Sequence, residues 1–286
     1  MGGTTAFVLG GGGVLGAAEV GMVKALAEAG IVPDLVVGTS VGAINGAVVA
    51  ADPKDRVAER LTGLWTSPAA REVFAASMPR QVRRLVRTGY AHSSGPLRRL
   101  LDPLAGLTFA DLDVPFHCCA ASVERAAEHW FSDGPVVDAV LASSAVPGLL
   151  PPVRIGDEHY LDGGLVNSIP VGRAVALGAR VIYVLQVGRI EQPLTAPRRP
   201  WEVANVAFEI ARRHRFASDM AALPADVEVH VLPTGVGASG GGGPGGDRRR
   251  DLDNLSPLAY RNFARTAGRI DRAYAATRDY LARQGG

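Results

Sequence analysis

Apolar positions near the start of the chain follow two different spacings. Residues 5–9 and 34–38 are short, continuous apolar runs, as expected of buried strands in a parallel sheet. Residues 17–30 place Val20, Val23 and Leu26 on one face of a helix, and Gly30 marks its end. A second helical segment of small residues follows at 40–51. This order of strand, turn and helix, given twice, predicts the start of an α/β fold with a parallel sheet.

The rest of the chain extends this pattern, with one interruption. Residues 53–107 are an Arg-rich segment with amphipathic helical spacing, which predicts an inserted helical cap. Residues 235–251 are rich in glycine and predict a flexible connector. The other predicted elements are a strand within 108–123, a helix from 136 that ends at Pro147 and Gly148, a strand running into a turn within 158–171, a helix and a strand within 172–188, a helix at 201–220, a strand at 226–233 and a closing helix at about 258–283. We therefore expect a single domain over 1–286 with a core at about 5–233, built as a three-layer α/β/α fold around a mostly parallel sheet.

Composition excludes several classes of protein. The 286 residues are 47% hydrophobic and 20% charged, and the net charge of +2 gives no field that would favour a nucleic-acid partner. Cys118 and Cys119 are neighbours on a predicted strand and point to opposite faces, so we expect no disulfide, a reducing compartment and a cytoplasmic location. His117 beside Cys118 lacks a second ligand cluster, and we expect no metal and no cofactor. Residues 35–51 are free of charge but too short and too polar for a membrane span, and no signal peptide is evident.

Four consecutive glycines, Gly10 to Gly13, follow the first predicted strand and have three explanations. Gly11, Gly13 and Gly16 fit a dinucleotide-binding loop, but the acidic residue at the required distance, Asp34, precedes its strand instead of following it. A phosphate-binding P-loop needs a Lys and a hydroxyl residue at its end, and both are missing here. The third explanation is an oxyanion-binding loop, whose exposed main-chain N–H groups stabilise a reacting carbonyl oxygen.

The second predicted strand ends in Gly38-Thr-Ser-Val-Gly42, which has the Gly-X-Ser-X-Gly pattern of a nucleophile elbow. In such an elbow Ser40 stands at a sharp turn from strand to helix, and Gly38 and Gly42 leave room for the turn. The apolar strand before it and the small-residue helix after it fit this structure. Ser40 is therefore the candidate nucleophile.

A serine nucleophile needs a base, and none of the six histidines has a convincing setting. Asp162 is the better candidate, because it follows a predicted strand and precedes Gly163 and Gly164 in a tight turn. A carboxylate is a weak base at its ordinary pKa, but burial raises that pKa and a direct hydrogen bond to Ser40 would let it act.

These stretches together resemble the patatin-like phospholipase family, in its bacterial form. The order of glycine loop, Gly-X-Ser-X-Gly and Asp-Gly-Gly matches, as do "ASSAVPGLLPPV" before the aspartate and "NSIPV" after it, over roughly 5–188. The resemblance implies hydrolysis of lipid acyl esters (phospholipase A, lysophospholipase or esterase) by a Ser40–Asp162 dyad without histidine. It also implies an oxyanion hole formed by Gly11, Gly12 and Gly13, with help from the Val41 N–H.

One departure from the family leaves alternatives open. The family's loop reads Gly-Gly-Gly-X-Arg/Lys-Gly, whereas this chain has Leu15 at the basic position. The alternatives are a catalytically weak, lipid-binding protein of the same fold, or a dinucleotide-binding oxidoreductase. The basic amphipathic segment at 80–99 suggests peripheral contact with anionic lipid, and an ordinary solvated helix face is the competing interpretation.

Overall fold

The computed structural model describes residues 3–54, 56–74, 93–187, 193–197, 200–235 and 265–284, and the fold is stated for these ranges. The strands are β1 (Thr5–Leu9), β2 (Leu35–Thr39), β3 (Phe116–Ser122), β4 (Ala127–Phe131), β5 (Val153–Ile155), β6 (Glu158–Asp162), β7 (Val181–Leu185) and β8 (Glu228–Val231). The helices are α1 (Ala17–Glu28), α2 (Val41–Ala51), α3 (Val57–Thr66), α4 (Pro68–Phe74), α6 (Gly95–Leu100), α7 (Val136–Ser143), α8 (Val171–Ala176), α9 (Pro200–Ala221) and α11 (Thr266–Gln284). Single 3₁₀ turns are η1 (Gly13–Gly16), η2 (Asp102–Leu104), η3 (Phe109–Asp111) and η4 (Gly163–Leu165).

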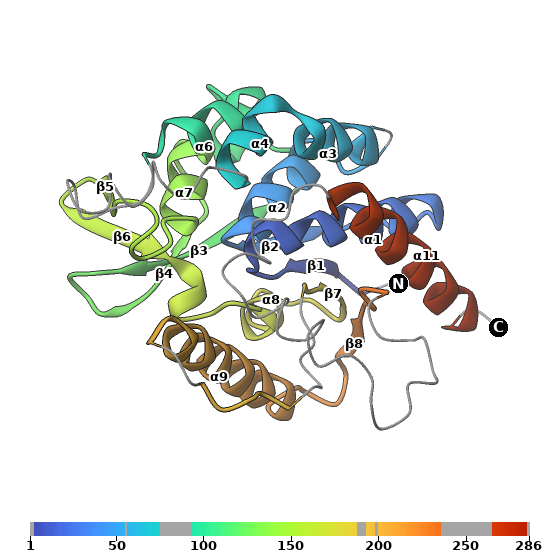
Figure 1. The fold of residues 1–286 in the computed structure, drawn as a ribbon. Helices are drawn as coiled ribbons and strands as arrows, with labels where there is room; N and C mark the ends of the chain where they lie inside the picture. Colours follow the sequence, from blue (N-terminus) through green and yellow to red (C-terminus); the bar gives the residue numbers. More distant parts are fainter. Residues whose placement is uncertain are drawn as a thin grey trace.

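The strands form one sheet between two layers of helices (Figure 1). The order is β5-β6-β3-β2-β1-β7-β8, and β4 also pairs with β3. Strands β3, β2, β1, β7 and β8 are parallel, whereas β4, β5 and β6 join by antiparallel pairs. The predicted α/β/α fold with a mostly parallel sheet is confirmed.

Strands β2 and β6 pair with successive parts of the same strand, β3, and so lie end to end. Cys118 and Cys119 pair with both β2 and β4, while Ala120 to Ser122 pair with both β4 and β6. A strand has only two edges, so β4 lies along one edge of β3, and β2 and β6 share the other. Thr39 at the end of β2 is opposite Cys119, and Asp162 at the end of β6 is opposite the next residue, Ala120. The last residues of β2 and β6 therefore meet.

The two faces of the sheet bury separate apolar clusters. Phe7 and Leu9 of β1 face the layer that holds α1, α2, α3 and α7, whereas Ala6 and Val8 face α8 and α9. This alternation is the two-residue period of a strand whose faces are both covered. Figure 1 shows the larger helical layer on one side of the sheet, with α8 and α9 on the other.

Strands β4 and β5 are not predicted from the sequence. β4 is largely polar and partly exposed, and β5 has three residues, so neither carries the continuous apolar run by which the central strands are found. The closing helix is described from Thr266, and residues 258–264 of the predicted helix lie outside the described residues.

The predicted cap falls between α2 and β3, where the structure places α3, α4 and α6. Leu61 and Trp65 of α3 and Leu100 of α6 are buried in the same cluster as the sheet. These helices are thus packed on the main core. Of the Arg-rich segment, the described Arg98 and Arg99 form exposed ion pairs with Asp138 and Glu72, at 3.0 and 2.6 Å. Residues 80–92 of that segment, and 236–251 of the Gly-rich connector, lie outside the described residues.

Across the described ranges, the helices lack the combination of length and hydropathy that crossing a bilayer requires.

Candidate active site

Ser40 stands between β2 and α2 in a strained backbone conformation. Its φ is +57° and its ψ is −124°, in the left-handed half of the map that non-glycine residues seldom occupy. Gly42 permits this turn, because a Cβ at that position would lie 2.2 Å from the carbonyl oxygen of Leu9. Such strain is typical of functional sites, where the surrounding structure holds it in place.

Two serines of the helix α7 region hold the turn from outside. The Ser143 Oγ accepts a hydrogen bond from the Ser40 N–H at 2.9 Å, and the Ser144 Oγ donates to the Ser40 carbonyl oxygen at 3.2 Å. Both serines are buried. They belong to the "ASSAVPG" stretch that carries the family resemblance, but the sequence alone does not reveal this contact.

Asp162 lies directly against Ser40. The Ser40 Oγ donates to Asp162 Oδ2 at 2.6 Å, and the Gly164 N–H donates to Asp162 Oδ1 at 2.7 Å. Burial raises the pKa of Asp162 to about 6, although both hydrogen bonds act in the opposite direction. The carboxyl group is thus a stronger base than an exposed aspartate, and its second oxygen is fixed by the turn that follows β6.

The glycine loop closes over the same end of the sheet. Its first two amides are engaged, since the Gly10 N–H donates to Leu185 O and the Gly11 N–H donates to Ser168 O, both at 2.9 Å. Gly13 has a φ of +56° and begins the turn η1. Gly11 is at the site, but its amide does not face it as a spare donor. Of the predicted oxyanion donors, the Gly11 N–H is therefore engaged elsewhere, and the amides of Gly12, Gly13 and Val41 remain a prediction.

A buried polar network ties this loop to three helices, and the sequence analysis did not find it. Asn45 of α2 donates to Gly16 O at 3.0 Å and to Glu19 Oε2 of α1 at 2.7 Å. Its own Oδ1 accepts from Trp65 Nε1 of α3 at 2.9 Å. Burial raises the pKa of Glu19 well above its ordinary value, although the hydrogen bond from Asn45 acts in the opposite direction.

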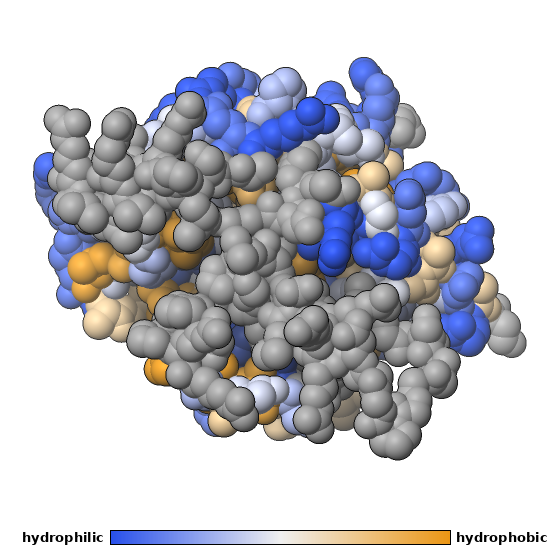
Figure 2. Space-filling view, in the orientation of Figure 1, coloured by the Kyte–Doolittle hydropathy of each residue, from blue (hydrophilic) through white to orange (hydrophobic). Residues whose placement is uncertain are grey.

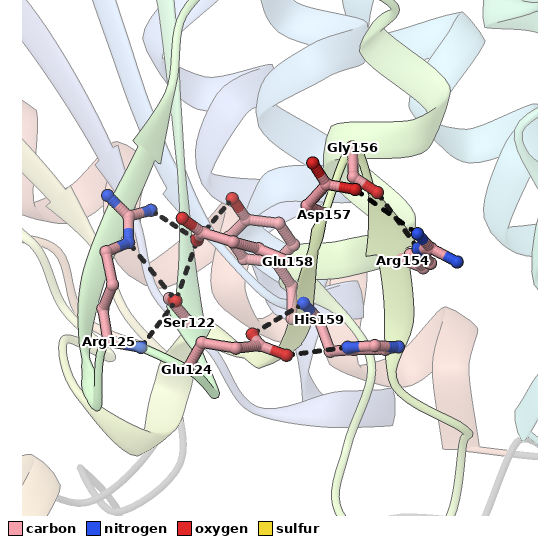
Figure 3. A network of polar contacts seen from close by, with 9 residues as sticks. Ser122, Glu124, Arg125, Arg154, Gly156, Asp157, Glu158 and His159 are labelled. Atoms are coloured by element: carbon pink, nitrogen blue, oxygen red, sulfur yellow. Dashed lines mark hydrogen bonds and ion pairs between the residues drawn. The ribbon is translucent and has the colours of Figure 1, made fainter.

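A second network fixes β6 at the end away from Asp162 (Figure 3). Glu158 accepts from Ser122 of β3 at 3.0 Å and pairs with Arg125 at 2.9 Å. Glu124 accepts from both the backbone and the ring of His159, at 2.8 and 2.7 Å. These hydrogen bonds to His159 lower the pKa of Glu124 to about 2. The network joins β6 to β3 beside the main-chain pairing of Ser122 with Tyr160, and this pairing sets the register that places Asp162.

Asp34 and the two cysteines, which the sequence analysis weighed as ligand residues, lie outside the Ser40–Asp162 site. Asp34 accepts from the Thr5 N–H at 2.8 Å, at the start of β1, whereas the glycine loop follows its end. A strand of this length separates the two by roughly 15 Å, so Asp34 does not face the loop. Within the described part of the chain, His, Cys, Asp and Glu side chains form no group of three or more that is suited to a metal ion. Cys118 and Cys119 are free and buried.

The fold and the site define an α/β/α protein in which a serine on a strained elbow is hydrogen-bonded to a buried aspartate. The chain belongs to the patatin-like phospholipase family, whose sequence model matches residues 7–175.

Curated relatives align over part of the chain. Lysophospholipase nte1 of Aspergillus terreus is 33% identical over 192 residues, which is 64% of this chain and 12% of the relative. Patatin-like phospholipase domain-containing protein ZK370.4 of Caenorhabditis elegans is 33% identical over 192 residues, or 65% of this chain and 14% of the relative. The chain therefore spans only about an eighth of the length of these relatives.

Solved structures with a related arrangement are more distant. VipD from Legionella pneumophila has a TM-score of 0.46 and 15% identity, covering 94% of this chain and 67% of that chain. The type III effector protein ExoU has a TM-score of 0.32 and 18% identity, covering 77% of this chain and 53% of that chain.

Proposed function

We propose that this chain hydrolyses acyl esters of lipids, with Ser40 as nucleophile and Asp162 as general base. The observation that carries the proposal is the 2.6 Å hydrogen bond from Ser40 Oγ to Asp162 Oδ2 in a buried site. Membership of the patatin-like phospholipase family supports a lipid ester as the substrate. Relatives that are named lysophospholipases support it further.

In the first half of the reaction, Asp162 takes the proton of Ser40 Oγ as the oxygen attacks the ester carbonyl carbon. The carbonyl oxygen becomes an oxyanion and accepts hydrogen bonds from the amides of Gly12, Gly13 and Val41. Val41 is the first residue of α2, and the first N–H groups of a helix have no partner within it. Collapse of the intermediate breaks the bond to the alcohol, which leaves with the proton from Asp162, and the acyl group stays on Ser40.

In the second half, Asp162 takes a proton from water, which attacks the acyl-Ser40 ester. The oxyanion is held by the same amides, and its collapse releases the fatty acid and returns the proton to Ser40 Oγ. Losing one oxyanion donor costs on the order of 3 kcal/mol in the barrier, so the amides contribute much of the rate.

Apolar side chains beside the site support a lipid substrate. Leu165, which is 43% exposed, follows Gly164 in the turn η4. Phe208 of α9 borders the same turn, because its ring lies 2.8 Å from where a Cβ of Gly164 would be. Figure 2 shows apolar surface over the side of β4–β6 and beside α9. We propose that this rim meets the acyl chains of a lipid aggregate.

The experiment is hydrolysis of p-nitrophenyl esters of increasing acyl length by the wild type, Ser40→Ala and Asp162→Asn. We expect each substitution to lower kcat by at least about a thousandfold, because the two residues act as one unit. Activity retained in Ser40→Ala would overturn the mechanism. A wild type that binds lipid vesicles but hydrolyses no ester would instead support the lipid-binding alternative.

A further inference from the structure

Arg212 of α9 is a buried cation that the proposed mechanism does not use. The residue is 3% exposed, and within the described structure its Nε and Nη2 have no hydrogen-bond partner. Its Nη1 makes two long bonds to Glu209, at 3.4 and 3.5 Å, and Glu209 is shared with Arg213 at 3.3 Å. Among the described residues, Arg212 is thus bonded to a carboxylate through one nitrogen alone, and at long distance. Burying a guanidinium charge costs several kcal/mol unless something compensates it.

The position of Arg212 on α9 is fixed by two aromatic neighbours on the same helix face. Phe216, one turn later, is buried in the cluster beneath β1 and β7. Phe208, one turn earlier, packs beside Gly164, in the turn that holds Asp162. Residues four apart lie on one side of a helix, so Arg212 lies between the apolar cluster and the turn after β6.

Two further buried side chains with polar atoms unpartnered in the described structure, Gln186 and Ser168, lie next to the glycine loop. Gln186 directly follows β7, and the alternation of Ile182 and Val184 places its side chain on the face that α9 covers. The Ser168 Oγ would be 3.1 Å from a Cβ on Gly11, and the Ser168 carbonyl oxygen accepts from the Gly11 N–H. Gln186 Oε1 and Ser168 Oγ have no hydrogen-bond partner among the described residues.

The absence of a basic side chain at position 15 of the glycine loop bears on the role of Arg212. At the position where the family's glycine loop has Arg or Lys, the Leu15 side chain packs on the main apolar cluster. Burial raises the pKa of Glu19, and the Arg212 charge partly offsets this rise, so the cation acts on a side chain that is joined to Gly16 through Asn45. The loop thus lacks the family's basic side chain, while a cation of α9 acts on the residue beside it.

We propose that Arg212, with Gln186 and Ser168, forms a subsite for the phosphate group of a lysophospholipid substrate. An arginine offers paired N–H donors that match phosphate oxygens, and Ser168 Oγ and the Gln186 amide supply polar neighbours. This inference rests on the proposed ester hydrolysis and names its preferred substrate as a phosphate-bearing lipid.

The test compares two substrates with the same acyl chain, 1-palmitoyl-lysophosphatidylglycerol and the neutral 1-palmitoylglycerol. We expect Arg212→Gln to lower kcat/KM at least about tenfold for the phosphate-bearing lipid, and to change the neutral ester and p-nitrophenyl butyrate less than about twofold. Arg213→Gln is the matched control, since it removes the same charge from the same helix and from the same Glu209. Equal losses on both palmitoyl substrates, or no loss on either, would overturn the subsite.

A binding measurement keeps the proposal testable if Arg212→Gln folds poorly. We expect sn-glycerol 3-phosphate to inhibit wild-type hydrolysis of p-nitrophenyl butyrate competitively, and glycerol at the same concentration to have no effect. Inorganic phosphate as a further arm separates recognition of the whole headgroup from recognition of phosphate alone. Equal inhibition by glycerol and glycerol 3-phosphate contradicts the proposal.

Failure of the subsite and failure of the proposed function give different results. A wild type that cleaves neutral esters but shows no response to phosphate contradicts the subsite alone. A wild type that cleaves no ester contradicts the proposed function. In that case, calorimetric titration of the wild type and Arg212→Gln with glycerol 3-phosphate decides whether the site binds phosphate.

Discussion

The pKa of one residue sets the pH dependence that we expect. Burial raises the pKa of Asp162 to about 6, and the proposed base is the ionised carboxylate. The value of kcat/KM should therefore fall about tenfold per pH unit below pH 6 and level off above it. The measurement is a pH profile of p-nitrophenyl butyrate hydrolysis between pH 4 and 8. A profile that is flat down to about pH 4 would show that Asp162 keeps its ordinary pKa or is not the base.

The same shift predicts that Asp162 destabilises the folded chain at neutral pH. The folded state binds the proton more tightly than the unfolded state, whose Asp pKa is near 3.8, so stability falls as pH rises from about 4 to 6. Two pKa units correspond to about 3 kcal/mol. We expect Asp162→Asn to raise the free energy of unfolding by about 1–3 kcal/mol at pH 8, measured by urea denaturation, while abolishing hydrolysis.

The control for this prediction is Asp157→Asn, because the Asp157 side chain is fully exposed. It should leave stability unchanged within about 0.5 kcal/mol. The gain from Asp162→Asn should also shrink towards pH 4, where the wild-type carboxyl group is protonated. A gain that is independent of pH would contradict the electrostatic explanation.

At the scale of elements, Asn45 joins α2, α1 and α3 through one side chain. Replacing it by leucine leaves Trp65 Nε1 and Glu19 Oε2 buried without these partners, and removes the side-chain donor to Gly16 O. Each such group costs about 1–3 kcal/mol, so we expect Asn45→Leu to lower the free energy of unfolding by about 3–5 kcal/mol in urea denaturation.

The companion variant Glu19→Gln separates this network from a charge effect. Burial raises the pKa of Glu19 and so favours its neutral form, and we therefore expect the neutral amide to cost less than about 1 kcal/mol. A loss as large as that of Asn45→Leu would indicate that Glu19 is ionised and that its charge supports the helices.

The elements themselves are largely predictable from sequence, because their signals are local. The runs of β1 and β2, the turn around Ser40 and the turn after Asp162 are each encoded within a few residues. The Asn45 network is different: Asn45 reads as one polar residue in a small-residue helix, and its partners come from segments 20 to 29 residues away. The contacts of Ser143 and Ser144 with Ser40 join residues more than 100 positions apart, so a local sequence pattern cannot predict them.

At the scale of the whole molecule, the apolar rim predicts a difference between soluble and aggregated substrates. We expect Leu165→Ser to bind lipid vesicles roughly threefold to tenfold more weakly, because an exposed apolar side chain of the rim no longer enters the lipid. Hydrolysis of p-nitrophenyl butyrate should stay within about twofold. Vesicle sedimentation and the soluble assay measure the two effects.

Val123→Ser is the matched control for the rim. Val123 is 48% exposed, but it directly follows β3, near the end of β6 where Glu158 and His159 lie and away from Asp162. We expect this variant to bind vesicles like the wild type. Equal weakening by Val123→Ser would mean that general surface hydropathy, and not the rim beside the site, governs vesicle binding.

The meeting of β2 and β6 on one edge of β3 has a consequence for how the sequence can vary. Ser40 and Asp162 are 122 positions apart, yet main-chain hydrogen bonds to seven consecutive residues of β3 set their spacing. Because pairing with β3 fixes the distance between Ser40 and Asp162, insertions in the connecting loops leave the two residues in place. One residue added between Cys119 and Ala120 would shift the two strands apart by about 3.3 Å and break a 2.6 Å contact. Length changes among functional relatives should therefore spare this heptapeptide, however freely they occur elsewhere between Ser40 and Asp162.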